Sequence, residues 1–535
     1  MVALLRRLEE PLVSLAVQLS IAGVFFLPLL ARLDDAILAN DIFIQPGRSD
    51  AYNFLWGYWW VQKAVSLGVS PLHCSWVLPP TGADLRLHTL PLLPAMISYP
   101  LGRALGTVSA YNLTVLCLLA GGALAAQWTF RRALGLSAAA ALAAGVLFGF
   151  SPYFVYQAHA HLHLLGPVFW VGALGQIVTA YERHDFGPRR GMLLALFVWA
   201  TFWSSLTEFT MLAIVGGALA VLYELAPPAG RPSWIERLRL VLPVLPGAVS
   251  LLPVLRGGTG HIAVAMGHGL RLRNFLRFPP LSALSPPDVA FVAGFGGMYL
   301  PLALAVPAAV GLVLAWRRRR DLLPLAAAAG VAGLLTVNAF HVPSGLLRSM
   351  PLGVGFRDFS RFYPFFLFFA AGLAGLALER LWQWPRRRVA AFATVLLAAA
   401  FVAEYWPARL APSPVRRLTL TAALERQLDR GRFLLVVPRR EYRNVQDTWA
   451  VAFDMRSVHL SFVGREVAAE HDLRESLFPR VYLEPPRPRD PAFISDLRQL
   501  HVGYLLFESD ASPRPAVGRE IARQGEFSLW SLTGR

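Results

Sequence analysis

Apolar runs of about 20 residues recur along this chain, separated by short polar turns. A helix of that length crosses the hydrocarbon core of a bilayer. The candidate spans cover residues 11–31, 111–130, 137–157, 161–181, 191–206, 207–225, 240–256, 291–316, 321–340, 361–380 and 389–406. The sequence therefore predicts an α-helical polytopic membrane protein with about eleven transmembrane helices. The stretch 191–225 also fits one long, tilted span.

The basic residues predict how these spans are oriented. A net charge of +17 would suggest a nucleic-acid partner in a soluble protein, but here the arginines form short clusters between apolar runs, so no nucleic acid is expected. Cytoplasmic loops are enriched in Lys and Arg. A cytoplasmic N-terminus places every tight cluster inside the cell. These clusters are Arg131–Arg132, Arg183 with Arg189–Arg190, Arg231 with Arg237 and Arg239, Arg317–Arg320, and Arg386–Arg388.

The same orientation places four longer segments outside the cell: 32–110, 256–290, 340–360 and everything after 406. In the first of them, Ala51–Val65 and His88–Leu105 are typical of helices at the membrane interface. We therefore expect a membrane domain over 1–406, including the outer loop 32–110. Shorter apolar patterns after residue 406 predict a small extracytoplasmic α/β domain over 407–535. Its expected elements are strands at Arg432–Val437 and Gly503–Phe507 and a helix end at Asp496–His501.

Several short phrases occur in an order that matches a known pattern. They are Ser49-Asp50 leading into Phe54-Leu55-Trp56 and Trp59-Trp60; Pro80-Thr81-Gly82-Ala83-Asp84 with His88-Thr89-Leu90; Tyr111-Asn112-Leu113; Phe150-Ser151-Pro152-Tyr153 with His161 and His163; Arg357-Asp358-Phe359-Ser360-Arg361-Phe362; and Leu497-Arg498-Gln499-Leu500 before Val502-Gly503-Tyr504-Leu505-Leu506. In this order they resemble bacterial membrane proteins of the GT-C glycosyltransferase superfamily, over most of the chain. One departure is that the first loop carries Asp34-Asp35, Asp41 and Asp50, where several members place an Asp-Glu or Asp-x-Asp pair.

The resemblance implies an inverting transfer of a hexosyl or pentosyl group from a polyprenyl-phosphate-linked donor. The acceptor would be an envelope glycan, lipid or protein at the outer face of the bacterial cytoplasmic (inner) membrane. A transporter or flippase of lipid-linked glycans is the alternative, although it predicts polar residues deep in several spans and paired half-repeats. A non-catalytic envelope-assembly protein is a third hypothesis.

Such a transfer requires a base for the acceptor hydroxyl. Asp50 is the first candidate because it precedes the aromatic helix of the outer loop, and a helix N-cap is its alternative role. Asp35, just past the first span, and Asp84 are the other catalytic candidates, although a helix end and an ordinary turn explain them equally well. No cofactor is certain from the sequence, and a divalent cation (Mg²⁺ or Mn²⁺) is left open.

Four histidines and one glutamate within an apolar stretch are candidates for substrate binding. His88 belongs to the first outer loop, and His159, His161 and His163 occupy alternate positions at the start of the fourth span. Alternate spacing does not put all three on one helical face, and a solvated helix entry is the alternative. Glu208 lies within an apolar stretch, where an unpaired carboxylate is costly, so it should face a cavity or a partner such as Arg or His.

Arginines in the predicted outer loops are candidates for holding the leaving phosphate. Arg357 and Arg361 are four residues apart and fit one helical face. Arg273, between Arg271 and Arg277, belongs to a second group. Their outward placement runs against the usual bias for basic residues. Snorkelling at the bilayer edge is the alternative.

Overall fold

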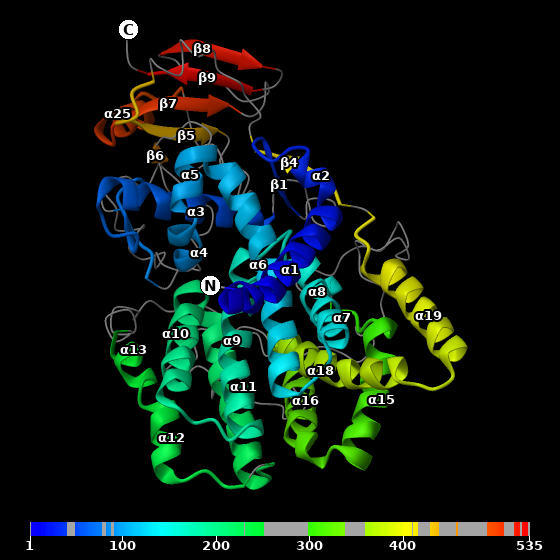
Figure 1. Ribbon diagram of the computed structural model, residues 1–535. Coiled ribbons are helices and arrows are strands. Elements are labelled where there is room, and N and C mark those ends of the chain that lie inside the picture. The colour runs from blue at the N-terminus through cyan, green and yellow to red at the C-terminus, as the bar shows by residue number, and fades with distance from the viewer. Residues whose placement is uncertain are drawn as a thin grey trace. The chain divides into compact units, whose positions relative to one another are not determined.

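The protein is described here from a computed structural model (Figure 1). The structure describes residues 2–39, 49–77, 82–86, 90–228, 230–250, 298–337, 359–408, 410–415, 428–437, 456–457, 489–507, 518–524 and 527–532. Contacts divide these residues into two compact units. The helical unit contains the described parts of 1–31, 113–252 and 264–410, and the sheet unit contains those of 32–112 and 411–535.

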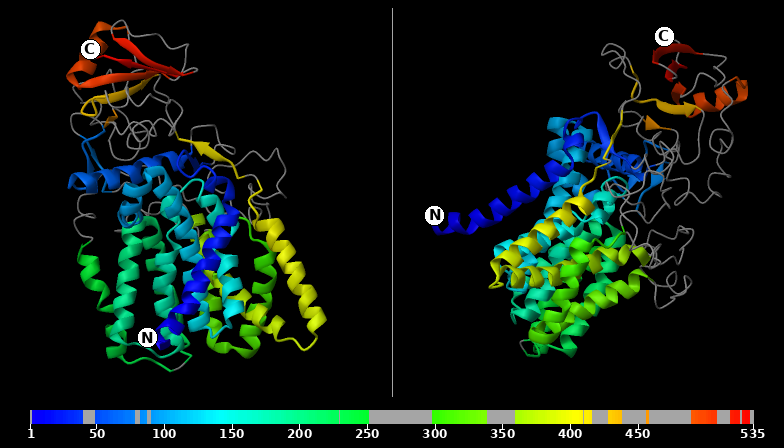
Figure 2. Two further views of the ribbon diagram at one scale, coloured as in Figure 1. Left: turned by 45° about the horizontal axis from the view of Figure 1, so that its top comes forward. Right: turned by 90° about the vertical axis from the view of Figure 1, so that its right-hand side faces the viewer.

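Most helices of the helical unit lie side by side in a bundle, and the N-terminal part of α1 projects from it (Figures 1 and 2). Its elements up to the middle of the chain are α1 (Val2–Phe25), α2 (Leu27–Leu30), α6 (Thr107–Ala133), α7 (Ala138–Gly149), α8 (Pro152–Gln157), the 3-10 helix η1 (Leu162–Leu164), α9 (Pro167–Glu182), α10 (Pro188–Ser204), α11 (Leu206–Leu225), α12 (Trp234–Val241) and α13 (Val244–Ser250). They are followed by α15 (Leu302–Arg318), η3 (Arg320–Leu322), α16 (Leu323–Thr336), η5 (Phe359–Phe362), α18 (Tyr363–Trp382) and α19 (Arg387–Tyr405).

The prediction of a polytopic α-helical membrane protein is confirmed. Within the described residues, five helical segments are long and apolar enough to cross a membrane. They are Thr107–Ala133, Leu162–Glu182, Leu206–Leu225, Phe359–Trp382 and Arg387–Tyr405. Shorter apolar helices lie at Pro11–Phe25, Ala138–Gly149, Leu302–Arg317 and Leu323–Thr336.

The structure rules out one alternative and corrects one predicted span. The stretch 191–225 is not one tilted helix, because the extended backbone of Ser205 (φ −163°, ψ 112°) separates α10 from α11. The span 137–157 is interrupted between α7 and α8, where Pro152 follows Ser151. Proline has no N–H and disfavours helical backbone in the residue before it, so a helix usually restarts there.

Helix α18 is the centre of the bundle and α19 lies at its margin. In the most apolar 18 residues of each helix, 89% of the residues of the segment that contains α18 are buried, compared with 17% in α19. Small residues allow α18 to approach its neighbours closely. A Cβ atom added to Gly311 of α15 would lie 1.9 Å from the carbonyl oxygen of Leu373, so the two helices touch backbone to backbone.

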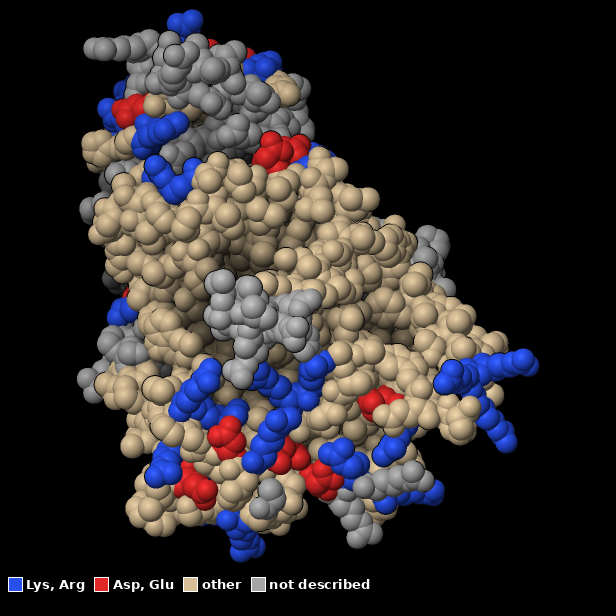
Figure 3. Space-filling view, viewed as in Figure 1, with Lys and Arg blue, Asp and Glu red and all other residues tan. Residues whose placement is uncertain are grey.

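The predicted arginine clusters lie in the connections of α6 to α7, α9 to α10, α11 to α12, α15 to α16 and α18 to α19, or in the helix turns next to these connections. Figure 3 shows the basic side chains of the helical unit gathered along its lower border. Several have acidic partners nearby: Arg190 pairs with Asp185, and Arg237 bonds Glu224 at 2.7 Å. We call this the arginine-rich end of the bundle. Its cytoplasmic location stays a prediction.

The sheet unit contains the first outer loop and the C-terminal residues. Its helices are α3 (Asp50–Leu67), α4 (Leu92–Ile97), α5 (Tyr99–Leu105) and α25 (Pro491–Gln499). Its strands are β1 (Ala36–Leu38), β2 (His73–Cys74), β3 (Ala83–Asp84), β4 (Pro412–Pro414), β5 (Phe433–Val437), β6 (Arg456–Ser457), β7 (Val502–Phe507), β8 (Arg519–Gln524) and β9 (Phe527–Ser531). Strand β1 pairs antiparallel with β4, which joins the two parts of the chain.

Five strands form a sheet in the order β6-β5-β7-β9-β8. Strand β5 is parallel to β6 and β7, whereas β9 is antiparallel to β7 and β8. The predicted strands at Arg432–Val437 and Gly503–Phe507 are β5 and β7, and α25 accounts for the predicted helix end. The small α/β fold is thus confirmed. The domain boundary at residue 406 stays a prediction, and residues 32–112 group with the C-terminal part of the chain instead of with the helical bundle.

Candidate functional site

Helices α9, α11, α15 and α18 all begin at the end of the bundle opposite the arginine-rich turns. Hydrogen bonds connect these helix starts: the Trp170 indole of α9 donates to Glu208 of α11, and Tyr363 of α18 donates to the carbonyl of Tyr299, just before α15. The N-terminus of a helix carries unsatisfied N–H groups and a partial positive charge. This end of the bundle, which we call the N-terminal end, therefore favours an anionic group.

Glu208 is a buried carboxylate at this end. It is 3% exposed and lies three residues after Ser205, the N-cap of α11, whose Oγ accepts its backbone N–H at 3.2 Å. Its Oε1 accepts a hydrogen bond from the Trp170 indole at 3.2 Å. The partner is thus a tryptophan and not the Arg or His that the sequence suggested. The backbone N–H of Gly166 also donates to the carboxylate, whose Oε2 borders this glycine.

Gly166 makes room for the Glu208 carboxylate. A Cβ atom at Gly166 would lie 2.4 Å from Oε2, well inside van der Waals contact. The glycine immediately precedes Pro167, the first residue of α9. The start of α9 thus borders the carboxylate directly, and only a residue without a side chain fits there unless the carboxylate moves.

Arg361 lies in η5, immediately before α18, and is half-buried. Its Nη1 donates to Oγ1 of Thr207 at 3.4 Å, and Thr207 precedes Glu208 in the first turn of α11. Four residues further along, Phe365 stacks on Trp170 with ring centroids 4.2 Å apart. The structure therefore brings Arg361 against the first turn of α11, the turn that also carries Glu208.

The three histidines divide into two environments. His159 is fully buried, and its Nδ1–H donates to the carbonyl of Val155 at 2.8 Å. Burial lowers the pKa of His159 to about 4, so it is neutral at physiological pH. His161 is half-buried and bonds Gln157 through Nδ1 at 2.7 Å, and its ring lies 5.7 Å from that of His163. His163 is part of η1, and α9 begins after it at Pro167, so no α-helix begins near His161.

Asp50 is the first residue of α3 in the sheet unit. The N-cap of this helix is Ser49, whose Oγ accepts the backbone N–H of Ala51 at 3.3 Å. The alternative role of Asp50 as N-cap is therefore wrong. Asp50 is half-buried, and its catalytic role stays a prediction.

The other acidic candidates each have an arginine partner. Arg32 Nη2 bonds Asp35 at 2.6 Å, and Asp35 is 51% exposed. Arg86 Nε bonds Asp84 Oδ2 at 2.9 Å, and these hydrogen bonds lower the pKa of the Asp84 carboxyl below its usual value. A carboxylate held in this way is a weaker base.

Three predicted site residues, His88, Arg273 and Arg357, lie outside the described residues. Among the residues that the structure does describe, no group of three His, Cys, Asp or Glu side chains is close enough to hold a metal ion. Asp35 and Asp84 are also engaged by arginines. A divalent cation stays a prediction.

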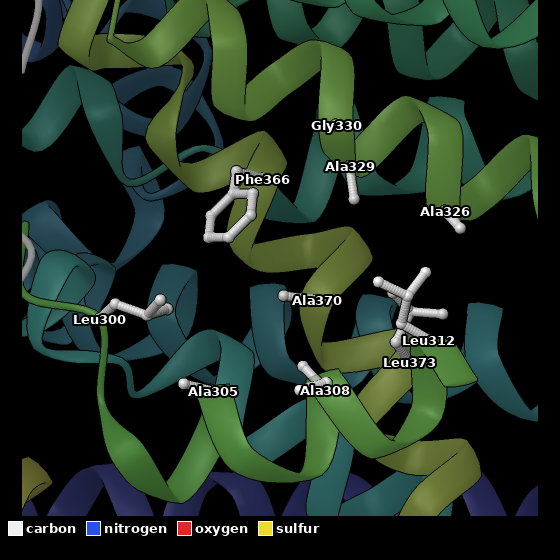
Figure 4. A pocket seen from close by; sticks show the side chains of 11 residues that line it. Leu300, Ala305, Ala308, Leu312, Ala326, Ala329, Gly330, Phe366, Ala370 and Leu373 are labelled. Carbon is white, nitrogen blue, oxygen red and sulfur yellow. The ribbon is translucent and has the colours of Figure 1, made fainter. Parts of the chain in front are cut away.

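A groove runs between α15, α16 and α18. Its volume is about 290 Å³, and Figure 4 shows side chains from all three helices pointing into it. The lining residues are Leu300, Ala305, Ala308, Ala309, Leu312, Ala326, Ala329, Gly330, Phe366, Ala370 and Leu373. None carries a polar side chain. On the outside of α15, Leu302 and Val306 are more than half exposed, as expected for a surface that meets lipid. The groove suits a hydrocarbon chain.

Sequence reasoning missed Glu404, a buried carboxylate near the end of α19. It is 4% exposed and accepts hydrogen bonds from Tyr299 and from two backbone N–H groups of α15. A usable signal was present, because Glu404 is an acidic residue inside the apolar run 389–406, as Glu208 is in its own run. The tyrosine that it binds gave no such signal.

No protein-family model matches this chain, and no curated protein matches it. Solved structures do. ArnT from Cupriavidus metallidurans aligns over 97% of both chains with a TM-score of 0.52 and 14% identity. The oligosaccharyltransferase of Archaeoglobus fulgidus, crystallised with Zn and sulfate, aligns over 92% of this chain and 68% of its own (TM-score 0.51, 14% identity). The arabinofuranosyltransferase AftD from Mycobacteria aligns over 98% of this chain (TM-score 0.52, 17% identity).

These similarities establish the fold. The protein has the fold of the GT-C glycosyltransferases, as the ordered phrases in the sequence predicted. At 14 to 17% identity, the similarity extends to architecture and not to substrate. The chain spans 40% of the length of the mycobacterial enzyme.

Proposed function

We propose that the protein is an integral membrane glycosyltransferase. It moves a sugar from a polyprenyl-phosphate donor to an envelope glycan, lipid or protein at the outer face of the bacterial cytoplasmic membrane. The fold shared with glycosyltransferases supports this class of activity. The observation that carries the proposal is the position of Arg361, held against the first turn of α11 where several helices begin.

The donor phosphate would bind at this N-terminal end. A guanidinium offers several N–H donors to phosphate oxygens, and the helix starts add a favourable field. Negative charge develops on the leaving phosphate as the sugar departs, so donors fixed beforehand lower the barrier. Arg361 supplies these donors in the proposal, and Arg357 and Arg273 are the further candidates from the sequence.

The hydrocarbon chain of the donor would lie in the groove between α15, α16 and α18. The groove is apolar throughout, and one of its walls is α18, the helix that follows the turn bearing Arg361. A lipid with a charged head and a long apolar tail fits this arrangement, in which an arginine precedes the helix that forms one wall of an apolar groove. A flippase for the same lipid would also need such a groove, so transfer must be measured directly.

In the inverting reaction, the acceptor hydroxyl oxygen attacks the anomeric carbon from the face opposite the phosphate. The new glycosidic bond forms as the bond between carbon and phosphate oxygen breaks, and the electron pair leaves with the polyprenyl phosphate. Asp50 accepts the hydroxyl proton in our proposal.

The proposal is tested with purified protein, a radiolabelled polyprenyl-phosphate sugar and a membrane extract that supplies acceptors. We expect labelled product from the wild type, none from Asp50→Asn, and about 50-fold lower kcat/KM from Arg361→Ala, as for the loss of a charge-assisted hydrogen bond. Arg380→Ala is the matched control, because this exposed arginine lies at the opposite end of α18.

Full transfer by both Asp50→Asn and Arg361→Ala would overturn the assignment of these residues. If the wild type moves the labelled lipid across a vesicle membrane without transferring the sugar, the protein is a flippase. Activity that falls equally in Arg361→Ala and Arg380→Ala would mean that the loss of charge, and not the place of Arg361, matters.

A further inference from the structure

Glu404 joins the end of α19 to the start of α15. Its Oε1 accepts the Tyr299 hydroxyl at 2.6 Å and the backbone N–H of Leu302 at 2.9 Å, and its Oε2 accepts the N–H of Ala303 at 2.9 Å. The carboxylate thus caps a helix that belongs to a different part of the sequence. It does so at the positively polarised end of that helix, where a buried negative charge is stabilised.

The same bonds fix Tyr299, and Tyr299 in turn holds α18. Its carbonyl oxygen accepts the hydroxyl of Tyr363 at 2.7 Å. Tyr363 is the first residue of α18, fully buried, and lies two positions after Arg361. The Tyr299 hydroxyl thus donates to Glu404 and the Tyr299 carbonyl accepts the Tyr363 hydroxyl, so these bonds connect Glu404 with the first residue of α18, two positions after Arg361. We call them the Glu404 chain.

Because Tyr363 follows Arg361 by two residues, holding Tyr363 in place restricts the backbone of the turn that carries the arginine. The Thr207 bond to Arg361 is long, at 3.4 Å, so it guides the guanidinium only weakly. The bonds of the Glu404 chain are between 2.6 and 2.9 Å, in the range of strong hydrogen bonds. Besides its packing against α16 and α18, the turn η5 is therefore also connected to α15 and α19 through these bonds.

We propose that Glu404 is a positioning residue: through Tyr299 and Tyr363 it fixes the turn that presents Arg361 to the phosphate of the donor lipid. This inference rests on the proposed phosphate-holding role of Arg361. It adds a function to a carboxylate that touches no substrate. Loss of the hydrogen bonds of the Glu404 chain should weaken binding of the donor phosphate and leave binding of the hydrocarbon tail intact.

The test compares two tyrosine variants in the full-length protein. Tyr363→Phe removes the hydroxyl that donates to the Tyr299 carbonyl. Tyr405→Phe removes a similarly buried hydroxyl that donates to the Leu147 carbonyl at 3.0 Å and takes no part in the Glu404 chain of hydrogen bonds. Binding of a polyprenyl phosphate and of the uncharged polyprenol is measured for each variant in detergent. We expect Tyr363→Phe to weaken binding of the phosphate about fivefold and to leave polyprenol binding unchanged. Tyr405→Phe should change neither.

Glu404→Gln should give a larger loss of the same kind, because its amide nitrogen cannot accept the Ala303 N–H. If this variant does not fold, Tyr363→Phe decides the question. Equal effects of Tyr363→Phe and Tyr405→Phe, or equal losses for phosphate and polyprenol, would overturn the proposal.

Arg361→Ala separates this inference from the proposed function. If Arg361→Ala leaves phosphate binding unchanged, the phosphate-holding role itself is wrong. If Arg361→Ala weakens phosphate binding and Tyr363→Phe does not, only the role of Glu404 is wrong.

Discussion

Helices α11 and α12 both begin with the pattern Ser-x-x-Glu, yet their glutamates behave differently. At α12, Ser233 and Glu236 form a reciprocal capping box: Ser233 Oγ accepts the N–H of Glu236 at 3.3 Å, and Glu236 Oε2 accepts the N–H of Ser233 at 2.7 Å. At α11, Ser205 caps in the same way, but Glu208 turns away and binds Trp170. The serine follows the local capping pattern at both helices, whereas the glutamate follows it only at α12.

The difference arises from what precedes each serine. The backbone N–H of Ser205 already donates to the Thr201 carbonyl at the end of α10, at 2.8 Å, so it needs no second acceptor. Ser233 has no such helix before it, and Glu236 satisfies its N–H. A buried tryptophan N–H without an acceptor is costly, whereas an exposed amide can bond water. At the N-terminal end of the bundle, tertiary contacts therefore override a local capping preference.

Of the variants that test this difference, Glu208→Ala should lower the free energy of unfolding the most. The change leaves the buried Trp170 N–H without an acceptor and opens a cavity, so we expect a loss of about 3 kcal/mol in the free energy of unfolding. Thermal unfolding of the purified protein in detergent measures it. Glu208→Gln, which keeps an acceptor for Trp170, is the control. Equal stability of Glu208→Ala and wild type would show that the Trp170 bond contributes nothing.

A second prediction concerns pH, because His159 and Asp185 change their protonation state in different pH ranges. Burial lowers the pKa of His159 from 6.5 to about 4, so between these values the folded state binds fewer protons than the unfolded state. The stability that depends on neutral His159 is complete above pH 6.5, falls as the pH drops, and levels off below about pH 4. At pH 5 the expected loss is about 2 kcal/mol.

At the arginine-rich end, Arg190 lowers the pKa of Asp185, so this pair loses its contribution only when the carboxylate is protonated, in more acidic solution. Melting temperatures between pH 5 and 8 should therefore fall in the wild type and stay flatter in His159→Asn, whose amide can still donate to the Val155 carbonyl. The same slope in both proteins would rule out His159 as its source.

The outline of the bundle could be predicted from the sequence because its signals are local. Apolar length gave the spans, and proline after Ser151 accounts for a break that span length alone did not reveal. The residues that bind across the bundle could not be predicted in this way. Glu208 was recognised as a costly buried charge, but its partner Trp170 lies 38 positions earlier, and hydropathy does not pair residues at that distance. Glu404 has the same signal, and its partner Tyr299 is separated from it by 105 positions.

The smallest effect is expected for Glu236→Ala, which completes the comparison. This change removes one half of the capping box at α12, but Ser233 Oγ still accepts an amide of the first turn, and the freed Ser233 N–H can bond water. The melting temperature should fall by roughly a third or less of the shift in Glu208→Ala. Glu236→Gln should restore it, because an amide oxygen at this position accepts the same N–H. If Glu236→Ala proves as destabilising as Glu208→Ala, burial does not distinguish the two glutamates, and the functional interpretation of the N-terminal end loses its structural basis.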